Sequence, residues 1–150
     1  MAPSLSSAPF AVPQPSGDSG KCVLLVDDEH AYLDLLQQLL AEHLACPVHI
    51  FARATDALQA LPAYDVGLIV TDYNMPGMDG LEFLAEVHRQ RPQIPAVMIT
   101  AYVVNFTPEQ MARVPNLKAV VRKPFKWTAL AEHISWHWNG STPPFPSQGG

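Results

Sequence analysis

The sequence predicts an α/β fold in which a doubly wound, five-stranded parallel sheet carries five helices. Five short runs of apolar, mostly branched residues alternate along the chain with stretches whose apolar residues recur at helical spacing. This alternation is typical of parallel strands joined by helical crossovers, and right-handed crossovers place helices on both faces of the sheet. With 48% apolar and 15% charged residues, the 150-residue chain is expected to form one domain with a real core.

The first half of the chain contains two of the predicted strands and two of the helices. In chain order they are a strand at 21–26, a helix at 31–45, a strand at 47–51 and a helix at 55–61. The first helix is amphipathic, because leucines recur along one of its faces at Leu33, Leu36, Leu40 and Leu44. Pro62 stops the second helix, since proline lacks a backbone donor.

The second half supplies three more strands and three more helices. They are a strand at 66–72, a helix at 81–90, a strand at 96–100, a helix at 107–114, a strand at 119–123 and a helix at 127–138. Thr107, Pro108 and Gln110 form the start signal of the fourth helix, with a cap residue, proline at the first helical position and glutamine at the third. This helix is predicted to start late and to be short, ending near Val114.

Both ends of the chain are predicted to be flexible tails around a domain at 21–138. Residues 1–20 and 139–150 are rich in proline, serine and glycine and lack periodic apolar residues. No signal peptide is expected, and no apolar run approaches the roughly 20 residues needed to span a bilayer. A net charge of −5 without a basic stripe argues against direct nucleic-acid binding. We therefore expect a cytoplasmic chain without membrane or direct nucleic-acid partners.

The two cysteines, Cys22 and Cys46, lack metal-ligand spacing. In a cytoplasmic chain, the default interpretation is a reduced pair that packs as small apolar side chains. A redox link stays open, because the strands that follow the two cysteines could be neighbours in the sheet.

Reactive side chains stand at the ends of four of the five predicted strands. Asp27 and Asp28 follow the first strand, Asp72 ends the third, Thr100 the fourth and Lys123 the fifth. The carboxyl ends of parallel strands lie at one edge of a sheet, so these groups are expected to meet. Three neighbouring carboxylates repel one another unless a cation is present, and Mg²⁺ prefers such oxygen ligands. A lysine and a hydroxyl beside them suit a phosphoryl group.

Four motifs give this pattern a family resemblance. They are Asp27-Asp28, the run TDYNMPGMDG that contains Asp72, the pair Thr100-Ala101 and the triplet Lys123-Pro124-Phe125. Over about residues 20–138 the chain resembles the receiver domain of bacterial two-component response regulators (CheY-like). The resemblance implies a flavodoxin-like strand order of 2-1-3-4-5.

The resemblance also implies a role for each site residue. Asp72 would accept a phosphoryl group from a phosphohistidine on a sensor histidine kinase. Asp28 and Asp72 would bind Mg²⁺ directly, Asp27 mainly through water, and Asn74 through its backbone carbonyl. Lys123 would pair with the phosphoryl oxygens.

Thr100 would then move toward the phosphoryl group and shift the loop that follows it. The family usually carries Tyr or Phe three residues before the lysine as a switch coupled to this threonine, but this chain has Val120 there. Tyr102 or Phe106 is a candidate substitute. The apolar stretch at 102–106 is expected to expose Val103, Val104 and Phe106, and exposed apolar residues often mark a partner surface.

The chain is thus expected to be a stand-alone receiver that changes partner binding or relays the phosphoryl group, catalysing only its own phosphorylation and dephosphorylation. Expected partners are a kinase or phosphotransfer protein and a downstream protein that binds residues 102–114 and 119–138, and a homodimer stays open.

One alternative is a scaffold that signals without phosphorylation. The other is a Mg²⁺-dependent phosphatase with an aspartate nucleophile. Asn74 argues against the phosphatase, since it cannot donate the proton that the leaving group needs.

Overall fold

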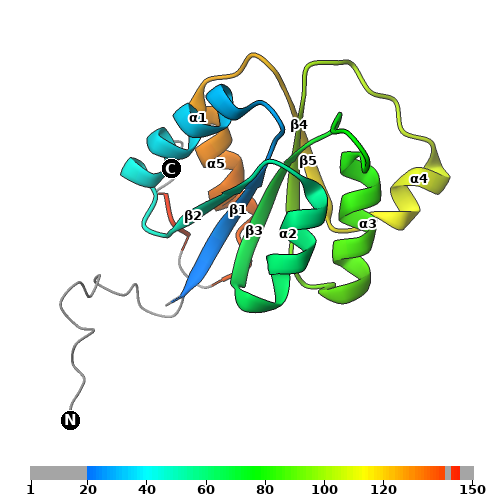
Figure 1. The fold of residues 1–150 in the computed structure, drawn as a ribbon, viewed down its shortest axis with the longest axis horizontal. Coiled ribbons are helices and arrows are strands. Elements are labelled where there is room, and N and C mark those ends of the chain that lie inside the picture. The colour runs from blue at the N-terminus through cyan, green and yellow to red at the C-terminus, as the bar shows by residue number, and fades with distance from the viewer. Residues whose placement is uncertain (1–19, 141–142, 146–150) are drawn as a thin grey trace, which may run out of the picture.

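The computed structural model describes residues 20–140 and 143–145, so most of the predicted N-terminal tail lies outside the described residues. Its five strands form one parallel sheet in the predicted order β2-β1-β3-β4-β5 (Figure 1). The strands are β1 Lys21–Val26, β2 Val48–Phe51, β3 Asp65–Asp72, β4 Ala96–Thr100 and β5 Leu117–Arg122. The predicted fold class is therefore confirmed.

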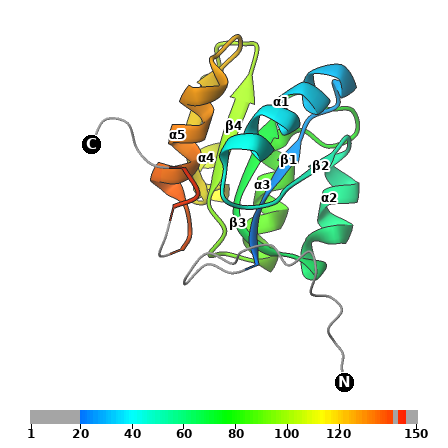
Figure 2. The same cartoon turned by 90° about the vertical axis from the view of Figure 1, so that its left-hand side faces the viewer.

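Helices cover both faces of the sheet. They are α1 His30–His43, α2 Ala54–Ala60, α3 Gly80–Gln90, α4 Pro108–Arg113 and α5 Trp127–His137, with a 3-10 turn η1 at Leu61–Ala63. α1 and α5 lie on one face, and α2 and α3 lie on the other (Figures 1 and 2). The part of the chain that the structure describes contains no helix long and apolar enough to cross a membrane.

Strand alternation divides the core between the two faces. Along β1, Leu24 and Val26 pack on the α2–α3 side, while Val23 and Leu25 pack on the α1–α5 side. All four of these side chains are fully buried, so a one-residue slip of the strand would exchange the two sets and is strongly disfavoured. This register holds the end of β1, and Asp27 after it, level with the end of β3.

The short fourth helix is confirmed at its predicted start. Thr107 Oγ1 accepts a hydrogen bond from the Gln110 N–H (3.1 Å), and the Gln110 side chain accepts one from the Thr107 N–H (2.8 Å). This capping box begins α4 at Pro108, and the helix ends at Arg113. The segment at 101–106 before it contains no helix.

Most predicted boundaries differ from the structure by one or two residues, and two of these differences have a local cause. β5 begins at Leu117 rather than 119, because the backbone of Leu117 pairs with Ala96 ahead of a register shift in the β4–β5 pair. α5 ends one residue before Trp138, whose ring is buried against Gly67 while Trp136 stays 80% exposed.

Residues 143–145, within the stretch predicted as the C-terminal tail, contact the α1–α5 layer. The Pro144 carbonyl accepts a hydrogen bond from the Ala45 N–H (2.9 Å), and the Phe145 N–H donates one to Ser135 Oγ (3.0 Å). The Phe145 ring lies edge-on to Trp127, with centroids 6.2 Å apart. These contacts join the end of α1 to α5.

Candidate functional site

Asp72 ends β3 and is almost fully buried, with 7% of the residue exposed. One carboxylate oxygen, Oδ1, accepts a hydrogen bond from the Tyr73 N–H at 2.8 Å. Gly80, the first residue of α3, closes the following loop tightly, since a Cβ there would lie 2.5 Å from the Asp72 carbonyl oxygen. Only glycine fits this approach, which fixes the backbone that carries Asp72.

Asp27, Asp28 and Asp72 form an acidic cluster. One carboxylate oxygen from each lies within 4.8 Å of the others, and among the described residues no other group of three metal-ligating side chains comes together in this way. Burial raises the pKa of Asp72 to about 6, and the charge of Asp27 adds to the rise, while Lys123 opposes it. Three crowded carboxylates suit a small divalent cation, so the residues present fit Mg²⁺.

Lys123 reaches this cluster from the end of β5. Its Nζ atom lies 3.1 Å from Asp27 Oδ2, 2.9 Å from Glu29 Oε1 and 3.7 Å from Asp72 Oδ2. The ammonium also stands 4.8 Å from the centre of the Tyr32 ring, which is a cation–π distance. Burial by itself lowers the pKa of Lys123, but the bonds to Glu29 and Asp27 outweigh it and raise that pKa overall. The lysine is therefore a fixed positive charge beside Asp72.

Thr100 is buried at the end of β4, next to the same edge of the sheet. Its Oγ1 atom accepts a hydrogen bond from the Tyr102 N–H at 3.1 Å. Its carbonyl oxygen accepts one from the Lys123 N–H at 2.7 Å. The threonine is thus bonded both to the loop after β4 and to the residue that carries the ammonium.

The segment at 102–106 is only partly exposed, which corrects the expectation for two of its residues. Val103 is 69% exposed, as predicted, but Val104 and Phe106 are half-buried. The Phe106 ring packs edge-on against Tyr73, with centroids 5.4 Å apart. Val120, at the usual position of the switch aromatic, is 42% exposed. The aromatic contact of this loop is therefore made with the residue after Asp72.

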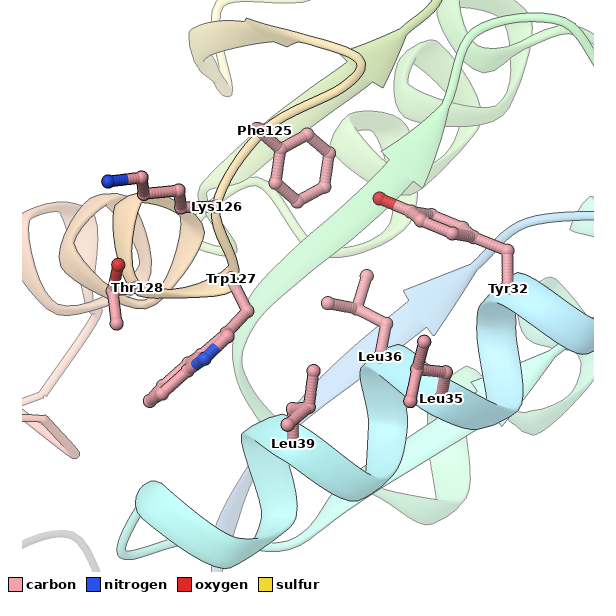
Figure 3. A pocket seen from close by; sticks show the side chains of 8 residues that line it. All are labelled: Tyr32, Leu35, Leu36, Leu39, Phe125, Lys126, Trp127 and Thr128. Atoms are coloured by element: carbon pink, nitrogen blue, oxygen red, sulfur yellow. The ribbon is translucent and has the colours of Figure 1, made fainter.

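Sequence reasoning missed two residues that contact Lys123, namely Glu29 and Tyr32. Glu29 follows the acidic pair directly, which was the available signal, while Tyr32 lies on the first turn of α1 and gave none. Tyr32 also lines a pocket of about 340 Å³ between α1 and α5, where its ring faces Phe125 across the upper end (Figure 3). The backbone carbonyl of Asn74 stays a predicted ligand.

Comparisons with known proteins point to one family. The family described as the response regulator receiver domain matches residues 23–135. The response regulator protein FleR of Pseudomonas aeruginosa is 33% identical over 125 residues, a match that covers 81% of this chain and 25% of FleR. The chain thus spans about a quarter of that relative's length.

Solved structures show the same fold. A CheY-like receiver domain protein from Methanospirillum hungatei superposes with a TM-score of 0.66 at 32% identity, covering 77% of this chain and 91% of that one. The response regulator TrrA from Thermotoga maritima, solved in complex with Mg²⁺ and BeF, superposes with a TM-score of 0.67 at 25% identity. That match covers 76% of this chain and 96% of TrrA.

Proposed function

Because the chain belongs to the response regulator receiver family, we propose that it accepts a phosphoryl group on Asp72 and changes its protein contacts in response. The donor is a phosphohistidine on a sensor histidine kinase or a phosphotransfer protein. The observation that carries this proposal is the approach of Lys123 Nζ to within 3.7 Å of Asp72 Oδ2 inside the acidic cluster. We further propose that the receiver domain spans 21–138 and acts in the cytoplasm.

The transfer itself is a displacement at phosphorus. An Asp72 carboxylate oxygen attacks the phosphorus atom, and the phosphorus–nitrogen bond of the donor breaks. The electron pair of that bond goes to the imidazole, which takes up a proton, and Asp72 becomes an acyl phosphate. The Lys123 ammonium, close to Asp72, pairs with a phosphoryl oxygen. It thereby stabilises the negative charge that develops on the phosphoryl oxygens during transfer.

The acidic cluster is proposed to hold Mg²⁺. Asp28 and Asp72 would bind it directly, Asp27 mainly through water, and Asn74 through its backbone carbonyl. When bound, the ion supplies positive charge that offsets the repulsion between these carboxylates and the incoming phosphoryl group. The complex of TrrA with Mg²⁺ and BeF supports this assignment by similarity.

Phosphorylation is proposed to reach partners through the loop after β4. Thr100 turns its hydroxyl toward the new phosphoryl oxygens, which disturbs its hydrogen bond from the Tyr102 N–H. The loop then shifts the exposed side chains of Tyr102 and Val103. The downstream partner binds residues 102–114 and 119–138, or the phosphoryl group is passed on to a second histidine.

Intact mass spectrometry tests the proposal. The protein is incubated with Mg²⁺ and acetyl phosphate, with Asp72→Asn as the matched control. We expect the gain of one phosphoryl group in the wild type and none in the variant or in the presence of a chelator. A folded wild type that gains no mass would instead favour the scaffold that signals without phosphorylation. Steady release of phosphate from external phosphoesters would favour the phosphatase.

A further inference from the structure

We propose that Glu29 is a positioning residue that holds the Lys123 ammonium beside Asp72 when a divalent cation engages the aspartates. The inference rests on the proposed function, since it concerns the lysine that pairs with the phosphoryl group. Glu29 makes the shorter of the two hydrogen bonds that Lys123 Nζ donates, at 2.9 Å against 3.1 Å for Asp27.

Glu29 differs from the other carboxylates near Lys123 in one respect. Asp27 and Asp72 both belong to the acidic cluster, so a cation bound there would draw on the same two carboxylates as the ammonium. The Glu29 side chain lies outside the cluster and is 63% exposed. It therefore remains a partner for Lys123 when the aspartates turn to the cation.

The backbone places Glu29 for this role. Its N–H donates a hydrogen bond to Asp27 Oδ1 at 3.0 Å, and the residue forms the N-cap of α1. The same residue thus contacts the cluster through its backbone and Lys123 through its side chain. The Tyr32 ring, in the first turn of the same helix, lies 4.8 Å from the ammonium and is a second contact that limits its movement.

This arrangement keeps the nucleophile accessible. The distance of 3.7 Å from Lys123 Nζ to Asp72 Oδ2 is too long for a hydrogen bond. The ammonium is therefore near Asp72 but does not block its carboxylate oxygens. Without the Glu29 carboxylate, the ammonium moves onto Asp27 and Asp72. There it competes with the cation and covers the attacking oxygens.

The test is a Mg²⁺ titration of four proteins: wild type, Glu29→Gln, Lys123→Met and the double variant. We expect Glu29→Gln to weaken Mg²⁺ binding about two- to fivefold in the wild-type background, given the exposure of the glutamate. In the Lys123→Met background only the loss of a nearby charge remains, so the effect is smaller. An equal effect in both backgrounds would overturn the proposal, because Glu29 would then act by its charge alone.

Glu29→Asp separates contact from charge without altering Lys123. It keeps the carboxylate but shortens the side chain, so the hydrogen bond to Nζ is lost. We expect Glu29→Asp to weaken Mg²⁺ binding and to slow phosphorylation by acetyl phosphate, nearly as Glu29→Gln does. Wild-type behaviour of Glu29→Asp would overturn the inference. Glu42→Gln, which removes an exposed charge from the far end of α1, is the matched control and should leave both readouts unchanged.

The two proposals fail in distinguishable ways. If the wild type gains no phosphoryl group but the Mg²⁺ titrations still show the Glu29–Lys123 coupling, the proposed function is wrong and the positioning role stands. If the wild type is phosphorylated and the titrations show no coupling, the proposed function stands and the positioning role of Glu29 is wrong.

Discussion

The ring of Phe106 lies edge-on to the ring of Tyr73, with centroids 5.4 Å apart and an angle of 67° between the planes. The N–H of the same tyrosine donates a hydrogen bond to Asp72 Oδ1. Two contacts therefore connect the candidate phosphorylation site to the loop before α4. A third contact to this loop is the hydrogen bond between Thr100 and Tyr102. Val120 occupies the position where the family usually carries the switch aromatic, and it is exposed.

Phe106→Leu is expected to weaken the coupling between the 102–106 loop and Asp72, leaving the route through Thr100 and phosphorylation itself intact. Leucine retains apolar volume but loses the edge-to-face contact, worth about 0.5–1.5 kcal/mol in other proteins. Hydrogen exchange of residues 102–106, with and without acetyl phosphate, measures the coupling. Val103→Ala, at an exposed neighbour, is the control. A wild-type response to phosphorylation in Phe106→Leu would show that the ring contact carries no signal.

The sequence predicted the parts of this structure that follow from periodicity and capping. The leucines of α1 and the Thr107 cap of α4 lie where the pattern predicts, because each depends on neighbours within one element. The Phe106–Tyr73 and Glu29–Lys123 contacts were not predicted, since each joins segments that meet only once the sheet has formed. The predicted start of β5 lies two residues too late, because the exposed Lys118 interrupts the apolar run of this strand.

Asp72→Asn is expected to stabilise the protein at neutral pH when divalent cations are chelated. The pKa of Asp72 is raised from 3.8 to about 6, so the folded state binds this proton more tightly than the unfolded state does. The stability of the wild type therefore falls as the pH rises from about 4 to about 6, at a cost of about 1–3 kcal/mol above that range. Asp72→Asn has no carboxyl to ionise at this position, so its stability does not fall for this reason as the pH rises.

Urea unfolding at several pH values measures the difference between Asp72→Asn and the wild type. The stabilisation by the variant should be full at pH 7.5 and should shrink toward pH 4. A constant difference across this range would mean that the ionisation of Asp72 is not its cause.

Mg²⁺ is expected to stabilise the wild type, and Asp28→Asn is expected to remove most of this effect. A ligand that binds only the folded state, at ten times its dissociation constant, raises the free energy of unfolding by about 1.4 kcal/mol. Asp28 is one of the three carboxylates in the acidic cluster. Asp56→Asn, on α2, is the control. Equal stabilisation of both variants by Mg²⁺ would place the ion elsewhere.

Gly67→Ala is expected to destabilise the protein by about 1–3 kcal/mol, the usual range for overpacking a core. A Cβ at this position would lie 2.4 Å from the ring of Trp138. Thermal or urea unfolding measures the effect. Trp138→Leu in the same chain makes room for the methyl group, so the double variant should lose less stability than the two single changes together. Strict additivity would show that the tryptophan is not the obstacle.

The ion pair between Asp27 and Lys123 joins residues 96 positions apart in the sequence. Such a contact closes a long loop, which costs chain entropy that the contacts of the folded sheet must offset. Until β5 joins the sheet, the three aspartates lack the lysine and repel one another. A chain in which β5 has not joined the sheet therefore lacks the lysine beside the acidic cluster, and the candidate site is assembled only in the folded domain.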